Sequence, residues 1–522
     1  MKIKYKPFEK PLELENFKDL IDFRVNSSNK IAYRYRLKKE IVEITAEQFK
    51  KHIEALGTYL YSCNHKNTKI ALIGENSYEW IVSYFAIVNG GNVVVPLDKE
   101  LPAGDLKELI TRSGCTALIY ADSYSDIAED NSELRTYSMK DFDKFYEEGQ
   151  KIIEDGNTEY IDFVPDGNAM SSIIFTSGTT GKPKGVMLSP KNMIADINAA
   201  GSISSLAGDT LLTLPLHHTF AFSTSVIANI MFEGTTAINA SLRNFKKDLA
   251  EFKPRNICVV PLYLESLYKN IWNGAKEQKK DKLLKTMIKI SNGLRKVGID
   301  LRRKLFKSIL DQLGGNLDLL VAGGAPISDV YTKGFDDFGI TVLNGYGITE
   351  CSPVVSVNEY GNLVLGSVGV VCNCCDVKIK DGEILVKGDN VMLGYFDDEK
   401  ATEEAFDDGW FKTGDLGHLE GNILFITGRK KNLIILSNGK NVSPEELEDL
   451  IITSIPNVNE VIVSAEGDYI GAEIYAENKE GIQEAINELN KNLPAYKQIK
   501  KVTFRDTEFE KTTTKKIKRK YN

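Results

Sequence analysis

The sequence predicts an α/β fold. A large N-terminal domain of helix-covered β-sheets carries a β-rich subdomain, and a small α+β C-terminal domain follows. Three observations support this. Helical and strand patterns alternate from about residue 42 to residue 170, which is typical of parallel sheets covered by helices. From Gly366 the segments become short and are separated by Asp-Gly and Gly-Asn turns, as in hairpins. About 94 residues remain from Arg429 onward, enough for one small domain.

The elements follow in order from these patterns. Thr45 and Gln48 have the spacing of a capping box, so a helix is expected from there to Tyr61. The other elements expected in the N-terminal domain are a strand at 69–74, a helix at 80–88, a turn and strand at 91–96, a strand end at 173–175 and βα units at 209–214, 257–260 and 317–321. The β-rich region is expected to hold strands at 377–380, 383–387 and 422–427.

The division into domains is placed between residues 428 and 429, which gives domains 1–428 and 429–522. In the second domain a helix is expected to begin at Ser443, a good N-cap, followed by Pro444 at the first helical position. A strand at 460–464 and a helix at 482–491 complete it.

Bulk composition restricts the class of protein. The chain is 42% hydrophobic and 26% charged, as expected for a globular protein. Its net charge of −8 argues against general nucleic-acid binding. Seven cysteines do not make a disulfide framework. The N-terminus has no apolar core of a signal peptide, and no apolar run reaches the roughly 18 residues of a membrane span. The expected location is the cytoplasm.

A loop rich in glycine and hydroxyl side chains follows the apolar strand pattern at 173–175. Its glycines allow close approach of the backbone to a ligand, and its N–H groups and lysines form an anion-binding concavity. The glycine spacing and Pro183 exclude a Walker loop. A flexible surface turn is the alternative. We interpret the loop as a polyphosphate site formed by Thr176, Ser177, Gly178, Thr179, Thr180, Gly181 and Lys182.

The segment 176–185 resembles the phosphate loop of the adenylate-forming superfamily, which includes acyl-CoA synthetases, firefly luciferase and the adenylation domains of peptide synthetases. Within it the chain is most similar to bacterial long-chain fatty-acid–CoA ligases, and further matches extend to the last ten residues. The resemblance implies the adenylate-forming enzyme fold, with a mobile C-terminal domain.

His218 lies in a segment, 214–221, that resembles the His-containing motif at the acid-substrate site of this superfamily. A lone His is otherwise more often structural. Amino-acid-activating relatives place an Asp soon after this motif, whereas no residue from 219 to 231 is acidic. A buried ammonium would be costly without a partner. The predicted substrate is therefore a carboxylic acid with an apolar tail, in a pocket formed by Phe220, Ala221 and Phe222.

Two segments resemble the adenine and magnesium sites of the family. Residues 322–326 follow an apolar strand, a pattern that by itself is more often just a turn. In 345–350, Tyr346 can stack on a base, Thr349 can bond a phosphate oxygen and Glu350 can hold Mg²⁺. A helix with Thr349 as N-cap is the alternative. The nucleotide-binding residues implied here are Gly323, Gly324, Ala325, Pro326, Tyr346 and Gly347.

Asp415 offers two acceptor oxygens for the two ribose hydroxyls and matches the ribose-binding Asp of the family. The resemblance further implies that Arg429 reaches the ribose or a phosphate and that Lys431 is the hinge between the domains. The family commonly has an acid where this chain has Asn432.

The remaining matches concern the thioester step and the catalytic lysine. Residues 437–444 resemble the loop that enters the active site for thioester formation, with Gly439 allowing close approach and Lys440 contacting CoA. Lys516 occupies the catalytic lysine position. Lys515 is its competitor, because the family normally has Gly there. A solvated basic tail is the alternative interpretation.

Two further clusters lie outside these motifs. Cys372, Cys374 and Cys375 have no His nearby and no matching pair, so a metal site is not expected, and their role stays open. The stretch 276–307 has twelve Lys and Arg residues against three acids, with interleaved Leu and Ile. It is either an ordinary solvated helix pair or a membrane-surface patch that collects lipid acids.

Together the roles compose one reaction. The substrate carboxylate attacks the α-phosphate of ATP and releases pyrophosphate, while Mg²⁺ on Glu350, the phosphate loop and Lys516 offset the charge of the transition state. The CoA thiol then attacks the acyl-adenylate and expels AMP. We therefore expect a long-chain fatty acid–CoA ligase that uses ATP, Mg²⁺ and CoA. The alternatives are delivery to a carrier protein, an aryl or shorter-chain acid substrate, and a non-catalytic nucleotide or lipid sensor.

Overall fold

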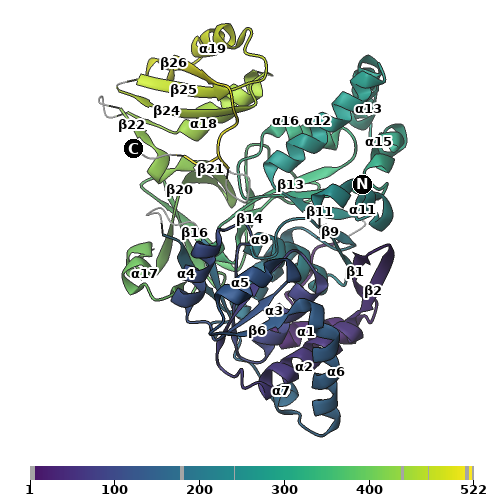
Figure 1. Cartoon of the computed structure of the whole chain (residues 1–522). Helices are drawn as coiled ribbons and strands as arrows, with labels where there is room; N and C mark the ends of the chain where they lie inside the picture. Colours follow the sequence, from purple (N-terminus) through teal and green to yellow (C-terminus); the bar gives the residue numbers. More distant parts are fainter. Residues whose placement is uncertain are drawn as a thin grey trace.

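The computed structural model describes residues 6–176, 182–239, 241–436, 440–455, 457–467, 469–511 and 517–519. Figure 1 shows a large body formed by most of the chain and a small C-terminal part, coloured yellow, at one end of it. The predicted α/β class is confirmed, with helix-covered sheets in the body and a small α+β part after them.

The first sheet carries the strand that precedes the predicted phosphate loop. Its strand order is β18-β8-β7-β4-β3-β5-β6. Strand β3 pairs in parallel with β4 and β5, whereas β7 and β8 form an antiparallel hairpin. The strands are β3 (Lys69–Ile73), β4 (Val93–Pro96), β5 (Ala117–Tyr120), β6 (Arg135–Ser138), β7 (Ser172–Thr176), β8 (Lys184–Leu188) and β18 (Gly394–Tyr395).

Helices pack around this sheet. Thr45 and Gln48 form the predicted capping box at the start of α2 (Ala46–Ser62). Every residue of α3 (Tyr78–Asn89) except Glu79 is buried, because α3 packs on β3 and β4 and is covered by α2. The other helices of this part are α1 (Phe17–Ser27), α4 (Ala103–Ser113), α5 (Ser125–Asp130), α6 (Phe142–Glu154), α7 (Glu159–Asp162) and α8 (Pro190–Ile203).

A second, longer sheet has the order β16-β17-β20-β21-β15-β14-β13-β12-β11-β9-β10-β1-β2, with β19 paired to β20. Strands β10, β9, β11, β12 and β13 run parallel. Its first half, up to β13, is antiparallel, and this confirms the hairpins predicted after Gly366. The strands are β1 (Ile31–Leu37), β2 (Glu40–Thr45), β9 (Thr210–Leu212), β10 (Thr236–Ile238), β11 (Asn256–Val259), β12 (Leu319–Ala322), β13 (Thr341–Gly347), β14 (Val354–Val357), β15 (Gly369–Val371), β16 (Cys375–Lys380), β17 (Glu383–Gly388), β19 (Phe406–Asp407), β20 (Trp410–Glu420) and β21 (Ile423–Arg429).

The helices between these strands include a group that lies at one margin of the molecule, α12, α13, α15 and α16 (Figure 1). The α12–α16 group packs around Phe306, Phe335 and Phe338. The bounds are α9 (Thr219–Phe222), α10 (Ala228–Met231), α11 (Phe245–Phe252), α12 (Pro261–Glu277), α13 (Asp281–Lys296), α14 (Arg302–Leu305), α15 (Lys307–Gln312), α16 (Asp329–Asp336) and α17 (Glu399–Ala405).

The C-terminal part has a hydrophobic core of its own, formed by residues from Ile434 to Ile499. Its elements are β22 (Ile434–Ile435), β23 (Asn441–Val442), α18 (Pro444–Ser454), β24 (Glu460–Glu466), β25 (Tyr469–Tyr475), α19 (Ile482–Asn490) and β26 (Ile499–Arg505). Helix α18 begins where predicted, but the Ser443 hydroxyl makes no capping bond and donates to Glu445 Oε2 at 3.0 Å. The boundary between 428 and 429 stays a prediction.

Two sequence features have a simple place in the fold. Cys372 and Cys375 are buried and Cys374 is half-buried, in the turn that leads into β16. Burial raises the pKa of the Cys372 thiol well above its usual value.

In the described part of the chain, no helix combines the length and the apolar character that crossing a bilayer would require.

Candidate active site

A buried carboxylate joins two of the predicted nucleotide residues. The Tyr346 hydroxyl, near the end of β13, donates to Asp415 Oδ2 at 2.7 Å, and Arg429 Nε lies 2.7 Å from Asp415 Oδ1. Asp415, on β20, is 3% exposed. A carboxylate at such a position must be paired and hydrogen-bonded, and these two donors meet that need. The sheet therefore brings together three residues that are up to 83 positions apart (429 − 346).

The same contact fixes the protonation state of the phenol. Burial, together with the Asp415 charge, raises the pKa of Tyr346 well above its usual value. Tyr346 is therefore a hydrogen-bond donor at physiological pH. The backbone around Asp415 is held as well, because Thr413 Oγ1 accepts from the Asp415 N–H at 3.0 Å and Glu383 Oε1 accepts from the Gly414 N–H at 3.1 Å. Glu383 had no recognisable signal in the sequence.

Glu350 lies beside the hairpin that carries the phosphate loop. It belongs to a three-residue 3-10 turn, Thr349–Cys351, preceded by Ile348, so the alternative of a helix with Thr349 as N-cap was wrong. The Tyr395 hydroxyl donates to Glu350 Oε1 at 2.9 Å, and Lys184 Nζ lies 4.6 Å from the centre of the Tyr395 ring. Because β18 pairs with β8, Tyr395 links the carboxylate to the hairpin. The sequence did not single out Tyr395.

The strands on both sides of the predicted phosphate loop are paired with each other. Thr176 pairs with Lys184 across the hairpin, and Lys182 is exposed. The predicted loop residues Ser177, Gly178, Thr179, Thr180 and Gly181 lie outside the described residues.

Mg²⁺ takes oxygen ligands, usually one or two carboxylates together with substrate phosphates. Glu350 is half-buried, keeps acceptor capacity beyond the Tyr395 bond and lies beside the base of the loop, so it fits that ion.

The predicted adenine segment and the predicted acyl pocket meet at one contact. A Cβ added at Gly323, directly after β12, would lie 3.3 Å from Cζ of Phe220. The same Cβ would lie 3.6 Å from the Gly345 carbonyl oxygen. Gly324 has φ +84°, a conformation that favours glycine, and no described residue other than its chain neighbours has an atom within 4 Å of the position its Cβ would take. Phe220 also packs against a buried cluster formed by Cys258, Leu319, Val321 and Leu343, as do partly buried Leu206, Leu214, Tyr360 and Leu363.

Ala221 and Phe222 point elsewhere. Both are buried, and the Phe222 ring packs against Trp80, Tyr84 and Phe85 in the main core. They support the short helix that presents Phe220. A direct contact of these two residues with substrate stays a prediction.

His218 has two neighbours that the sequence analysis did not select. The rings of His217 and His218 are 4.2 Å apart, and His217 Nε2 lies 3.4 Å from Asp98 Oδ1. Burial lowers the pKa of His217 well below its usual value, so its imidazole is neutral. Asn76 braces this turn by bonding to the Leu214 carbonyl and to the Leu216 N–H.

Among the described residues, Asp98, His217 and His218 form the one group with three metal-ligating atoms within 4.8 Å of one another. The doublet of histidines was the available signal for His217. Asp98 had none, because it joins the group only through the loop after β4.

The C-terminal candidates are only partly described. Lys431 lies in a 3-10 turn directly after β21, and Asn432 donates to Glu445. Lys440 Nζ lies 5.8 Å from the centre of the Tyr496 ring. Gly439, Lys515 and Lys516 lie outside the described residues. Lys511 and Ile517, which flank Lys515 and Lys516 in the sequence, pair as an antiparallel bridge. Lys511 Nζ lies 2.5 Å from Glu460 Oε1.

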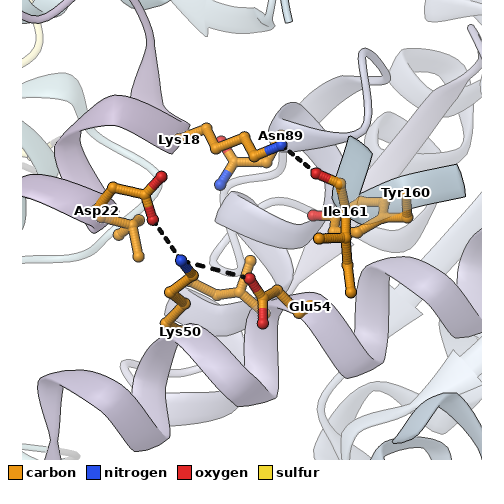
Figure 2. Close-up of a pocket in the computed structure, with 9 residues that line it drawn as sticks. Lys18, Asp22, Lys50, Glu54, Asn89, Tyr160 and Ile161 are labelled. Carbon is orange, nitrogen blue, oxygen red and sulfur yellow. Dashed lines mark hydrogen bonds and ion pairs between the residues drawn. The ribbon is translucent and has the colours of Figure 1, made fainter. Parts of the chain in front are cut away.

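A separate hollow between α1, α2 and α7 does not belong to this site (Figure 2). Its charged groups are satisfied locally. Lys50 Nζ lies 2.6 Å from Asp22 and 3.7 Å from Glu54, and Lys18 donates to the Ile161 carbonyl. In Figure 1 these helices are at the opposite end of the body from the C-terminal part. We therefore treat the hollow as structural.

Comparison with known proteins gives two family matches. The family described as AMP-binding enzyme matches residues 23–396, and the family described as AMP-binding enzyme C-terminal domain matches residues 431–521. Long-chain-fatty-acid–CoA ligase FadD15 of Mycobacterium bovis is 29% identical over 462 residues, which cover 82% of this chain and 76% of that protein.

Two further similar proteins have names that specify a different acyl acceptor or a different acid. Long-chain-fatty-acid–[acyl-carrier-protein] ligase AEE15 of Arabidopsis thaliana is 27% identical over 570 residues, covering 91% of this chain and 76% of that protein. The crystal structure of the anthranilate CoA ligase AuaEII in complex with anthranoyl-AMP superposes with a TM-score of 0.76 at 18% identity, covering 96% of this chain and 95% of that one. This similarity confirms the predicted adenylate-forming enzyme fold.

Proposed function

The chain belongs to the AMP-binding enzyme family, and on that premise we propose that it is a long-chain fatty acid–CoA ligase that forms AMP. One observation carries the proposal for an apolar acid. The ring of Phe220 lies against Gly323, so the apolar wall and the adenine segment share a contact. An acid bound along that wall would present its carboxylate to the nucleotide.

The nucleotide roles follow from the contacts of the site. Asp415 holds the ribose hydroxyls, with Tyr346 and Arg429 fixing its carboxylate. Glu350, held by Tyr395, would hold Mg²⁺. The loop between the paired strands β7 and β8, together with Lys182, would supply donors to the phosphates. Preorganised donors and a cation at this position would stabilise the charge that develops when the carboxylate attacks the α-phosphate. Mg²⁺ supplies charge neutralisation when it is bound.

The apolar character of the acid rests on the surroundings of Phe220. Phe220 packs against a buried apolar cluster, and partly buried Leu206, Leu214, Tyr360 and Leu363 pack against the same cluster. No acidic residue lies between 219 and 231 to hold a substrate ammonium. A long-chain acid would gain roughly 0.8 kcal/mol for each methylene buried in such a place.

The test is AMP release from ATP and Mg²⁺ with palmitate, in the presence and absence of CoA. We expect AMP and palmitoyl-CoA only when CoA is present. Turnover with anthranilate but not palmitate would overturn the substrate class and leave the adenylation chemistry. Absence of pyrophosphate exchange with any acid would favour the sensor interpretation.

The acceptor is the second point to be tested. Similarity to the carrier-protein ligase over 91% of this chain makes delivery to a carrier protein the rival function. Replacing CoA by a phosphopantetheinylated carrier protein in the same assay separates the two. Product on the carrier and none on CoA would reject the CoA ligase.

Single substitutions test which of the two neighbouring lysines is catalytic. We expect Lys516→Ala to abolish acyl-adenylate formation and to leave thioester formation from supplied palmitoyl-adenylate largely intact. Lys515→Ala is the matched control, with the same charge change one residue away. The opposite pattern would transfer the role to Lys515.

Lys431→Pro should restrict the hinge and slow the thioester step more than the adenylation step.

A further inference from the structure

Helix α13 (Asp281–Lys296) carries a row of exposed apolar side chains. Leu283 is 57% exposed, Ile290 56% and Val297, directly after the helix, 72%. They are seven residues apart, so they lie along one face of the helix with a small drift. Ile299, 47% exposed, follows them. Single exposed apolar residues are ordinary, but an aligned row on one helix is not.

A row of lysines lies beside the apolar row. Lys282, Lys285, Lys289 and Lys296 are all exposed. At 100° per residue they occupy the neighbouring part of the outer face of α13. No carboxylate of a described residue forms an ion pair with any of these four, whereas Arg295 and Lys307 nearby are paired with Asp336 and Asp311. The four lysines are thus available to an external anionic partner.

The inner face of α13 is fixed to the body. Leu284 is buried, and Met287 and Ile288 pack into the cluster of Phe306 and Phe338. Asn292 donates to Asp337 Oδ1 at 2.7 Å, and Arg295 pairs with Asp336 at 2.7 Å. The helix cannot turn its apolar row inward without losing these contacts, and Figure 1 places it at the margin of the molecule.

We propose that the outer face of α13, with Val297 and Ile299, docks on a lipid bilayer that contains anionic lipids. The argument for this partner is charge complementarity. The whole chain has a net charge of −8, yet residues 276–307 have twelve basic residues against three acidic ones, a local excess of nine (12 − 3). A bilayer interface takes up apolar side chains while lysines reach to the head groups. The proposal takes up the membrane-surface alternative for 276–307, and the ordinary solvated helix pair is the rival that the following experiment tests.

The test is flotation of the full chain with vesicles, without substrate, so its outcome is independent of the proposed ligase activity. Phosphatidylcholine vesicles are compared with vesicles that also contain phosphatidylglycerol. We expect binding to the anionic vesicles that weakens as salt is added. Each lysine near such a surface contributes about a fivefold factor, so reversing all four to Glu should reduce partitioning by more than about a hundredfold.

Two matched pairs of variants locate the surface. Lys282→Glu, Lys285→Glu, Lys289→Glu and Lys296→Glu are combined and compared with the same change at exposed Lys51, Lys144, Lys151 and Lys400, which gives an equal net charge. Leu283→Ser, Ile290→Ser and Val297→Ser are combined and compared with Leu37→Ser, Val164→Ser and Leu365→Ser, which are also exposed. We expect the α13 apolar variant to lose at least about tenfold and both controls to bind as wild type.

Several outcomes would overturn the proposal. If the wild-type chain does not float with anionic vesicles, the proposal is wrong. It is wrong in that case even if the same face binds an acidic protein such as an acyl carrier. Equal losses in the α13 variants and their controls would show that this face is not the docking surface. A folded α13 variant, checked by circular dichroism, that binds anionic vesicles as tightly as wild type would also overturn it.

Discussion

Replacement of Asp415 by Asn tests whether this carboxylate organises the nucleotide site. The change preserves the shape of the side chain and removes one acceptor oxygen and the charge. In the structure Oδ2 accepts from Tyr346 and Oδ1 faces Arg429, both at 2.7 Å. An amide offers one oxygen to the phenol, the guanidinium and the two ribose hydroxyls together. ATP binding should therefore lose at least one charge-assisted hydrogen bond.

The size of the effect follows from the charge-assisted hydrogen bond that is lost. A hydrogen bond to a charged group is worth about 1.5–3 kcal/mol, which corresponds to roughly a ten- to hundredfold fall in kcat/KM for ATP. Protein stability should change less, because Arg429 is 42% exposed and can be hydrated when its partner is lost. Tyr346→Phe keeps the carboxylate and the ring and removes one donor only. Its effect should be several-fold smaller.

Initial-rate kinetics of AMP formation, with ATP and the acid varied in turn, measure both variants. We expect KM for ATP to rise in Asp415→Asn while KM for the acid stays close to that of the wild type. The reasoning fails if KM for ATP is unchanged, if both constants rise equally, or if Tyr346→Phe is the more damaged variant.

Three other results are expected. Glu350→Gln should raise the Mg²⁺ concentration needed for half-maximal AMP formation by at least about tenfold, and an unchanged titration would remove Glu350 from the metal site. Gly323→Ala should lower kcat/KM for the acid by about tenfold, because its Cβ presses on Phe220; the double variant with Phe220→Ala should recover part of that loss, and no recovery would refute the contact. Burial raises the pKa of Glu448 to about 7 from 4.5. Because the folded state holds the Glu448 proton more tightly than the unfolded state, the free energy of unfolding is highest below about pH 4.5. It falls by about 3 kcal/mol in all as the pH rises through about 7. Urea unfolding should show a weaker dependence on pH in this window for Glu448→Gln, and identical slopes would contradict the assignment.

Hydrophobic periodicity and turn residues were sufficient for most elements. The capping box at Thr45, the buried helix around Trp80 and the hairpins after Gly366 depend on interactions within a few residues, and the structure has them as expected. Ser443 was the exception among the caps. Its hydroxyl donates to the Glu445 carboxylate and accepts no capping bond from the first turn of the helix, and residue preference at a helix start does not include such a side-chain partner.

The motif residues could be selected from the sequence because their segments resemble those of the adenylate-forming superfamily. The sequence could not give their supports, since these come from other strands and loops. Tyr395 reaches Glu350 only because β18 is added to the edge of β8. Asp98 reaches His217 only because two loops meet after β4 and β9.

The sequence by itself determined the element pattern, the phosphate-loop motif and the excess of basic residues at 276–307, because local propensity and composition are written in neighbouring residues. Only the tertiary structure decided which side chains face one another. It placed Phe220 on Gly323, Phe222 in the core, and Leu283, Ile290 and Val297 in solvent rather than inside. A helical period shows that a helix has two faces. Which of them is buried depends on the partners available, and those are fixed by the packing of the whole chain.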